Sequence, residues 1–162
     1  MRGGDRSPDS VLERLDIAIA SIHMPCFKDE RTIDNVTAAY EKVMEHPYVD
    51  IIGHPDDGRF PVDMKRLVKK AKETGTLLEV NNSSLRPEGF RENTKENCLE
   101  MVKECKAQGV MIVLGSDSHV DADIAEYPYA EEILRETDFP EELVANVSME
   151  KLKACIKHGK KL

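Results

Sequence analysis

Histidine, asparagine and aspartate side chains follow each of four short apolar runs in this chain. They are His23 and His54 after the first two runs, Asn81 and Asn82 after the third, and Asp117 and His119 after the fourth. Imidazole and carboxylate groups together are ligands that zinc, manganese and iron accept in proteins. If the four runs are neighbouring strands, the pattern favours a divalent-metal site whose ligands are the three histidines and Asp117.

The four apolar runs have the length and the Ile and Val content of buried strands. They occupy residues 17–22, 49–52, 77–80 and 110–114, and stretches with helical periodicity lie between them. This alternation predicts a parallel sheet with right-handed crossovers, in which every strand ends at the same edge. Ligands bind at that edge in parallel α/β folds. Four or five strands fit either a small open sheet or part of a β/α barrel.

Several residues mark the ends and the buried faces of the expected helices. Gly75 and Gly109 follow the second and third helical stretches, where we expect C-terminal caps. Asn93, followed three residues later by a glutamate, is typical of a capping box that would begin the third helix. Cys98 and Cys105 fall on one apolar stripe of that helix. Their spacing there is too long for a disulfide, so we expect core thiols.

Charged residues also follow the second and third strands, and they have two interpretations. The Pro-Asp-Asp-Gly sequence that contains Asp56 and Asp57 favours a simple turn over a functional role. Arg59, Arg86 and Arg91 could hold a phosphate group through two hydrogen bonds each. Arginines in loops are more often solvated, so the sequence leaves both interpretations open.

The overall composition excludes several classes of partner. The 162 residues suit one domain, and 23 Lys and Arg against 31 Asp and Glu give a net charge of −8. This sign is unfavourable for binding nucleic acid or an anionic membrane surface. The longest apolar run is too short to span a membrane. Residues 1–9 resemble a linker without the apolar core of a secretion signal, so we expect a cytoplasmic protein.

Five stretches, in this order, resemble the PHP (polymerase and histidinol phosphatase) superfamily, and most of all its stand-alone bacterial phosphatases. They are SIHMP at 21–25, DIIGHP at 50–55, LEVNNSS at 78–84, GSDSH at 115–119 and NVS at 146–148. The resemblance extends over nearly all of the chain after Asp9. The combination of the GSDSH stretch with the two strand motifs is far more specific than any one of them.

The resemblance implies that residues 1–162 are part of a distorted seven-stranded, TIM-like β/α barrel. Members of the superfamily hold two or three divalent metal ions at the carboxyl edge of the barrel and hydrolyse phosphate esters. By this analogy His23 and His54 would bind one ion, Asp117 a second and His119 a third. The His-x-His pair and the bridging glutamate that begin the family pattern have no counterpart in this sequence. We therefore expect a barrel without its N-terminal units and an incomplete active site.

Three functions follow from these observations. The first is a metal-dependent phosphoesterase in which water activated by zinc, manganese or iron hydrolyses a small phosphomonoester, with Asn81 and Arg59 as candidate substrate contacts. The alternative is a non-catalytic or truncated PHP fragment that keeps partial metal binding through His23 and His54. A PHP-type nuclease is disfavoured by the acidic composition. An incomplete barrel would also expose a strand edge, which predicts a homo-oligomer.

Overall fold

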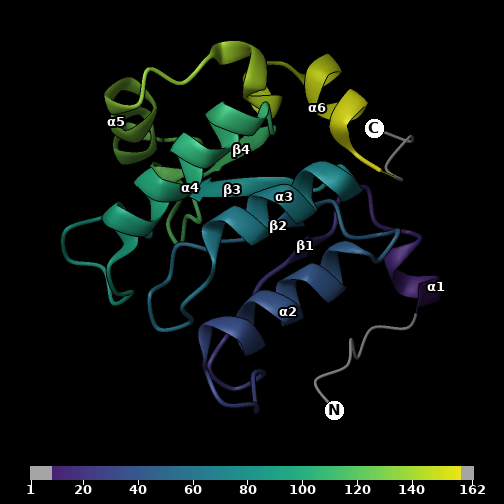
Figure 1. Cartoon of the computed structure of the whole chain (residues 1–162). Coiled ribbons are helices and arrows are strands. Elements are labelled where there is room, and N and C mark those ends of the chain that lie inside the picture. Colours follow the sequence, from purple (N-terminus) through teal and green to yellow (C-terminus); the bar gives the residue numbers. More distant parts are fainter. Residues whose placement is uncertain (1–8, 158–162) are drawn as a thin grey trace.

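Four parallel strands form a single sheet at the centre of the molecule (Figure 1). The computed structural model describes residues 9–157. The strands are β1 (Ile19–Ala20), β2 (Ile51–Ile52), β3 (Leu77–Asn81) and β4 (Ile112–Gly115). Each pairs in parallel with the next strand along the chain, in the order β1-β2-β3-β4. All four predicted strands are thus confirmed, although β1 and β2 are shorter than the apolar runs that contain them.

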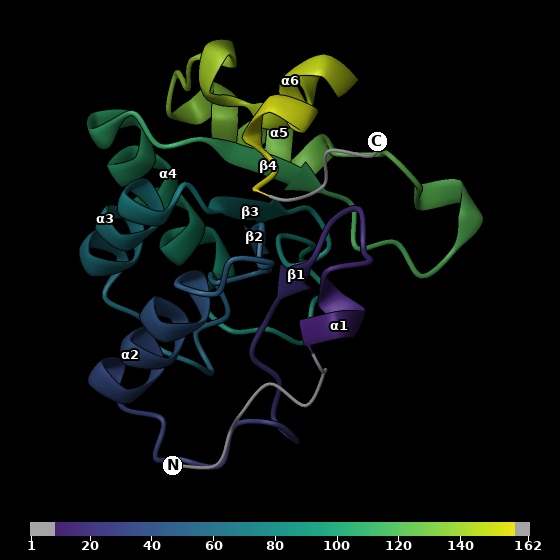
Figure 2. The ribbon, with the colours of Figure 1, turned by 90° about the vertical axis from the view of Figure 1, so that its right-hand side faces the viewer.

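Three helices connect these strands, and they lie side by side on one face of the sheet (Figure 2). They are α2 (Ile33–Met44), α3 (Met64–Thr74) and α4 (Thr94–Gln108). Consecutive strands with every connecting helix on one face are the arrangement of β/α barrel units, whereas doubly wound sheets carry helices on both faces. The α/β class is confirmed. A seven-stranded barrel stays a prediction, because the described residues form four strands.

The remaining elements lie at the two ends of the chain. They are the helices α1 (Asp9–Leu12), α5 (Pro128–Glu136) and α6 (Met149–Cys155), and 3-10 turns at 121–123, 141–143 and 145–147. Asp9 begins α1, and the rest of the expected linker lies outside the described residues. None of the helices in the described part of the chain is long and apolar enough to cross a membrane.

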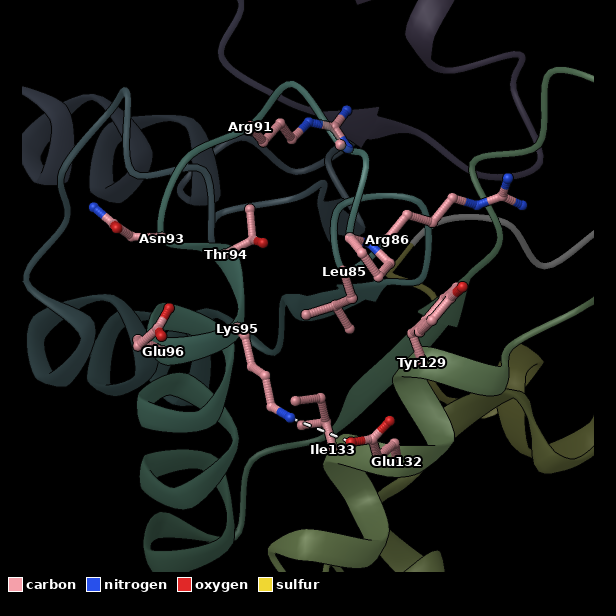
Figure 3. A pocket seen from close by; sticks show the side chains of 12 residues that line it. Leu85, Arg86, Arg91, Asn93, Thr94, Lys95, Glu96, Tyr129, Glu132 and Ile133 are labelled. Atoms are coloured by element: carbon pink, nitrogen blue, oxygen red, sulfur yellow. Dashed lines mark hydrogen bonds and ion pairs between the residues drawn. The ribbon is translucent and has the colours of Figure 1, made fainter.

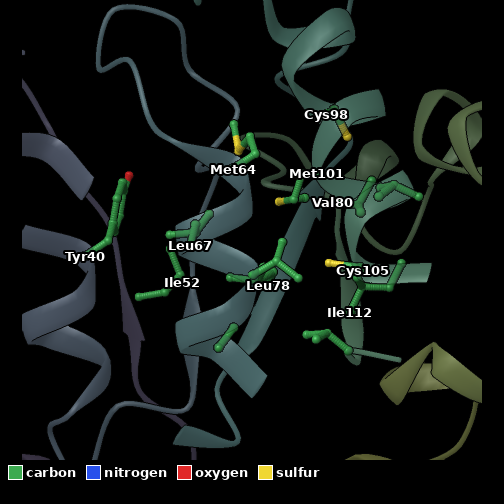
Figure 4. Packing of buried hydrophobic residues seen from close by; sticks show 14 of the residues in the cluster. Tyr40, Ile52, Met64, Leu67, Leu78, Val80, Cys98, Met101, Cys105 and Ile112 are labelled. Carbon is green, nitrogen blue, oxygen red and sulfur yellow. The ribbon is translucent and has the colours of Figure 1, made fainter. Parts of the chain in front are cut away.

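Alternation along the strands divides the buried apolar side chains into two clusters. Leu78 and Val80 point toward the helices and join the larger cluster, which Figure 4 shows with Leu67 of α3 and Met101 of α4. Leu77 points to the opposite face. There it belongs to a second cluster, completed by Ile51, Val113 and Ala145, with Leu152 of α6 packed against it. Both faces of the sheet therefore bury apolar surface.

The larger cluster also contains the two cysteines of α4. Cys98 and Cys105 are fully buried free thiols, as their spacing predicts, and Cys26 and Cys155 are also free. At the open side of the sheet, β1 pairs only with β2 among the described strands, and Ile19 is exposed. Association of two chains through this edge stays a prediction.

The helix ends follow the sequence except at the start of α4. Gly75 and Gly109 end α3 and α4 in the left-handed conformation, with φ of 67° and 69°, and this prediction is confirmed. The capping box at Asn93 is wrong. Asn93 has a φ of 51°, and its side chain makes no capping hydrogen bond. The chain turns sharply here because the Gly58 N–H donates to the Glu92 carbonyl, and the Thr94 hydroxyl donates to the Ser84 carbonyl.

Replacing Ile52 by alanine should lower the free energy of unfolding by about 2–5 kcal/mol, because the fully buried side chain leaves a cavity when it is shortened. Ile124→Ala is the matched control. Ile124 is 66% exposed, so its loss should change the free energy by less than about 0.5 kcal/mol. Urea unfolding followed by circular dichroism measures both values. Equal effects in the two variants would contradict the burial of β2.

Candidate functional site

His23 and His54 meet just beyond the carboxyl ends of β1 and β2. Their ring centroids lie 4.9 Å apart, with the rings inclined at 71°. The Ser21 hydroxyl lies 2.9 Å from Nε2 of His23, which ties that ring to the end of its own strand. The sheet therefore brings together the first two histidines that the sequence analysis selected.

The His54 ring is held in a form suited to binding a metal ion. Its Nδ1 atom is buried and has no hydrogen-bond partner in the structure. Burial lowers the pKa of His54 to about 4, and the positive charge of Arg91 and the neighbouring His23 act in the same direction. The imidazole is neutral at pH 7 as a result. Neutral imidazole nitrogen is the form that ligates metal ions.

Asp117 and His119 follow β4 at the same edge of the sheet. Asp117 lies close enough to His54 for its charge to favour the protonated ring, and its carboxylate pairs with Arg91 across 3.0 Å. His119 is exposed, and its Nδ1 lies 3.0 Å from the Asp117 backbone carbonyl. Within residues 9–157, no three His, Cys, Asp or Glu side chains are arranged to hold one metal ion. Two of the four expected ligands are in direct contact.

Arg91 is the most buried cation at this edge, with 7% of its side chain exposed. One terminal nitrogen donates to the Ser84 hydroxyl at 2.7 Å and to Oδ1 of Asn81 at 3.3 Å, and the other donates to Oδ2 of Asp117. Its Nε lies 3.9 Å from the Asp57 carboxylate. From the sequence, Arg91 could not be distinguished from Arg59 and Arg86, because local sequence does not reveal which loop side chain is buried.

Arg59 lies beside this group, but its charge is matched within its own turn. Nε and a terminal nitrogen of Arg59 donate to the two carboxylate oxygens of Asp57, at 2.9 Å and 2.5 Å. Burial opposes ionisation of Asp57, yet these hydrogen bonds lower its pKa. The guanidinium groups of Arg59 and Arg91 lie 4.9 Å and 5.3 Å from the centre of the exposed Phe90 ring. Both cations therefore border one aromatic side chain.

The two aspartates of the predicted turn have different roles. Asp57 accepts the backbone N–H of Arg59, and its carbonyl accepts the N–H of Phe60, as expected in a turn. Both aspartates are buried, but neither carboxylate oxygen of Asp56 has a hydrogen-bond partner. Burial raises the pKa of Asp56 to about 7. The turn interpretation explains Asp57 and leaves the buried carboxyl of Asp56 unexplained.

Glu79 is a buried charged residue that the sequence analysis did not select. It lies in β3 with 8% exposed, and burial raises its pKa. Its Oε2 accepts the backbone N–H of His54 at 2.8 Å and the Asn81 amide at 3.1 Å. The Asn81 oxygen accepts hydrogen bonds from Ser84 and Arg91. A glutamate between the apolar residues Leu78 and Val80 of a predicted buried strand is the signal that could have indicated Glu79.

A cavity of about 470 Å³ lies beside this edge, between the start of α4 and helix α5 (Figure 3). Leu85, Thr94 and Ile133 form part of its lining. The cations around it already have partners, because Lys95 pairs with Glu132 and Arg86 pairs with Asp123. Figure 3 shows the Arg86 and Arg91 guanidinium groups directed away from the middle of the cavity.

Replacing Arg91 by methionine should lower the free energy of unfolding by about 3 kcal/mol, because it leaves the partly buried Asp117 carboxylate without its partner. Arg66→Met is the matched control. Arg66 also contacts two carboxylates, but it is 40% exposed and its ion pairs are screened by water. We expect little change for the control in urea unfolding of the metal-free proteins. A larger loss for Arg66→Met than for Arg91→Met would contradict this difference in burial.

Two known proteins that are similar to this chain are both named as probable phosphatases. No family model matches the chain. The chain is 46% identical over 155 residues to a protein of Clostridium novyi named "Probable phosphatase", and 42% identical over 158 residues to one of Acetivibrio thermocellus with the same name. The alignments cover 96% and 98% of this chain, but 62% and 64% of the relatives. The chain is therefore similar, over nearly its whole length, to somewhat under two thirds of proteins named as probable phosphatases.

Proposed function

We propose that this chain is part of a metal-dependent phosphoesterase of the PHP type that hydrolyses small phosphomonoesters. The observation that carries the proposal is the contact between His23 and the buried, neutral ring of His54 at the carboxyl edge of a parallel sheet. The name of the similar proteins supports phosphate-ester chemistry. The resemblance of the strand-end motifs to the PHP superfamily supports the metal dependence.

The donor atoms at this edge fit part of a divalent-metal site. His54 Nδ1 is buried and without a hydrogen-bond partner, and His23 lies against the same ring. Arg91 contacts Oδ2 of Asp117, so we assign Oδ1 of Asp117 to the ion. His119 would turn away from the Asp117 carbonyl to take part. A bound zinc, manganese or iron ion would activate water and reduce the negative charge of the phosphate.

A phosphorylated substrate would have to compete with Asp57 for the Arg59 guanidinium, because the two side chains are paired in the structure. The net charge of the chain is −8, so a phosphate ester needs local positive charge to approach. Arg59 is the more accessible of the two guanidinium groups beside Phe90, and we assign it to the phosphate. The amide group of Asn81 is hydrogen-bonded to Glu79, Ser84 and Arg91. Asn81 therefore holds other residues of this edge in place from within the sheet.

One observation favours a second candidate function. No group of three metal-binding side chains is assembled in the part of the chain that the structure describes. A two-histidine site of this kind would bind an ion without completing the environment that hydrolysis requires. The second candidate is therefore a metal-binding fragment without catalytic activity of its own.

Removing a ligand separates the two candidates. The chain should retain divalent metal after dialysis. His54→Ala should reduce the affinity of the chain for the metal ion by more than about 100-fold, which is more than the loss that follows from replacing a residue that only supports a ligand. Asp117→Asn should abolish hydrolysis of a panel of phosphomonoesters. The control is His46→Ala, because His46 precedes β2 at the opposite edge of the sheet and contacts Tyr48.

Elemental analysis and phosphate release measure these effects. Hydrolysis that survives both His54→Ala and Asp117→Asn contradicts the phosphoesterase assignment to this edge. Metal that is retained by the chain and lost in His54→Ala, without hydrolysis of any phosphomonoester, supports the second candidate.

A further inference from the structure

Two residues that we assign to the metal site have unusual backbone conformations. His54 has a φ of 35° and Asp117 a φ of 47°, both in the left-handed region that residues other than glycine rarely adopt. Such conformations persist where surrounding groups hold them in place. The two residues follow β2 and β4, and β3 lies between them in the sheet.

Glu79 of β3 holds the His54 backbone. Its Oε2 accepts the His54 N–H at 2.8 Å, and the carboxylate is enclosed between the neighbouring strands. A Cβ atom at Gly53 would lie 3.4 Å from Oε2, and one at Gly115 would overlap the carboxylate. Glycine at position 115 therefore makes the room that the Glu79 side chain occupies, whereas a Cβ atom at position 53 would only touch the carboxylate.

The same carboxylate is connected to Asp117 through two more side chains. The Asn81 amide donates to Oε2 of Glu79 at 3.1 Å, and Oδ1 of Asn81 accepts from Arg91 at 3.3 Å. Arg91 then donates to Oδ2 of Asp117 at 3.0 Å. Hydrogen bonds thus run without interruption from the backbone of His54, across β3, to the carboxylate of Asp117. Glu79, Asn81 and Arg91 are all more than nine-tenths buried.

We propose that Glu79, Asn81 and Arg91 form a positioning network that holds the His54 backbone and the Asp117 carboxylate in place for a divalent ion. This inference rests on the proposed function and adds three residues that do not touch the ion. Glu79 sets the direction of the His54 imidazole through its backbone N–H. Arg91 orients the Asp117 carboxylate through one oxygen and leaves the other for the ion. Binding then costs less, because the ligands are ordered beforehand.

Glu79→Gln tests the network with little change of shape. The glutamine oxygen can take the place of Oε2, but it carries no charge, so the hydrogen bonds from the His54 N–H and the Asn81 amide lose their charge assistance and become weaker. The control is Glu41→Gln, because Glu41 also accepts two hydrogen bonds, from Arg66 on the surface of α2 and α3. Arg91→Lys is a second variant for the far end of the network, since lysine cannot form the same fork of hydrogen bonds.

Titration of the full chain with Co²⁺ measures both affinity and ligand geometry. Glu79→Gln should weaken Co²⁺ binding about 10- to 100-fold and change the visible absorption of the bound ion, and Glu41→Gln should leave both unchanged. Circular dichroism of the metal-free proteins establishes that the variants are folded. A purely structural role of Glu79 would lower the unfolding midpoint without altering the absorption of bound Co²⁺.

The outcomes separate this inference from the proposed function. Two results would overturn the positioning network alone. One is that the unmodified chain and Glu79→Gln bind Co²⁺ with equal affinity and identical visible absorption. The other is that Glu79→Gln changes the unfolding midpoint but leaves the visible absorption of bound Co²⁺ unchanged. If Glu79→Gln does not fold, the same comparison is decided by Arg91→Lys. Absence of Co²⁺ binding to the unmodified chain, or equal binding to His54→Ala, overturns the proposed metal site and the network with it.

Discussion

The parallel direction of the four strands is the constraint on which the rest of this structure depends. A parallel neighbour can be reached only by a crossover that returns the chain to the end where the previous strand began. Every strand therefore delivers its last residues to one edge, and α2, α3 and α4 fill the space on one face (Figure 2). Residues far apart in the sequence, such as His23 and His54, meet there as a consequence.

Polar groups at this edge are buried, and their hydrogen bonds determine its shape. Arg91 is surrounded by oxygen acceptors from three segments, and Glu79 accepts donors from two strands. Removing such groups from water is unfavourable unless each finds a partner, so the satisfied network restricts the loops to one arrangement. Buried atoms without a hydrogen-bond partner in the described part of this edge include Nδ1 of His54, the two carboxylate oxygens of Asp56 and Nε of Arg91. Unsatisfied buried atoms are where a ligand finds its contacts.

The names of the similar proteins bear on the type of reaction, and the geometry bears on which residues would take part in it. The relatives are named as probable phosphatases, and the chain matches 62% to 64% of the length of two of them. The geometry supplies a pair of histidines, a carboxylate held by an arginine and a second, partly buried arginine. Together they support phosphate-ester hydrolysis at the carboxyl edge of the sheet as the proposed activity.

The sequence by itself determined the four strands, the three connecting helices and the glycines that end α3 and α4, because periodicity and the left-handed conformation of glycine are local properties. It also placed candidate ligands at the strand ends, since the direction of a parallel sheet follows from the connections. Only the tertiary structure decided that Asn93 does not cap α4, that Arg91 is buried against Asp117, and that Glu79 accepts the backbone N–H of His54. Those contacts depend on which side chains from different segments lie close together in the folded chain, and the spacing of residues within one segment does not show this.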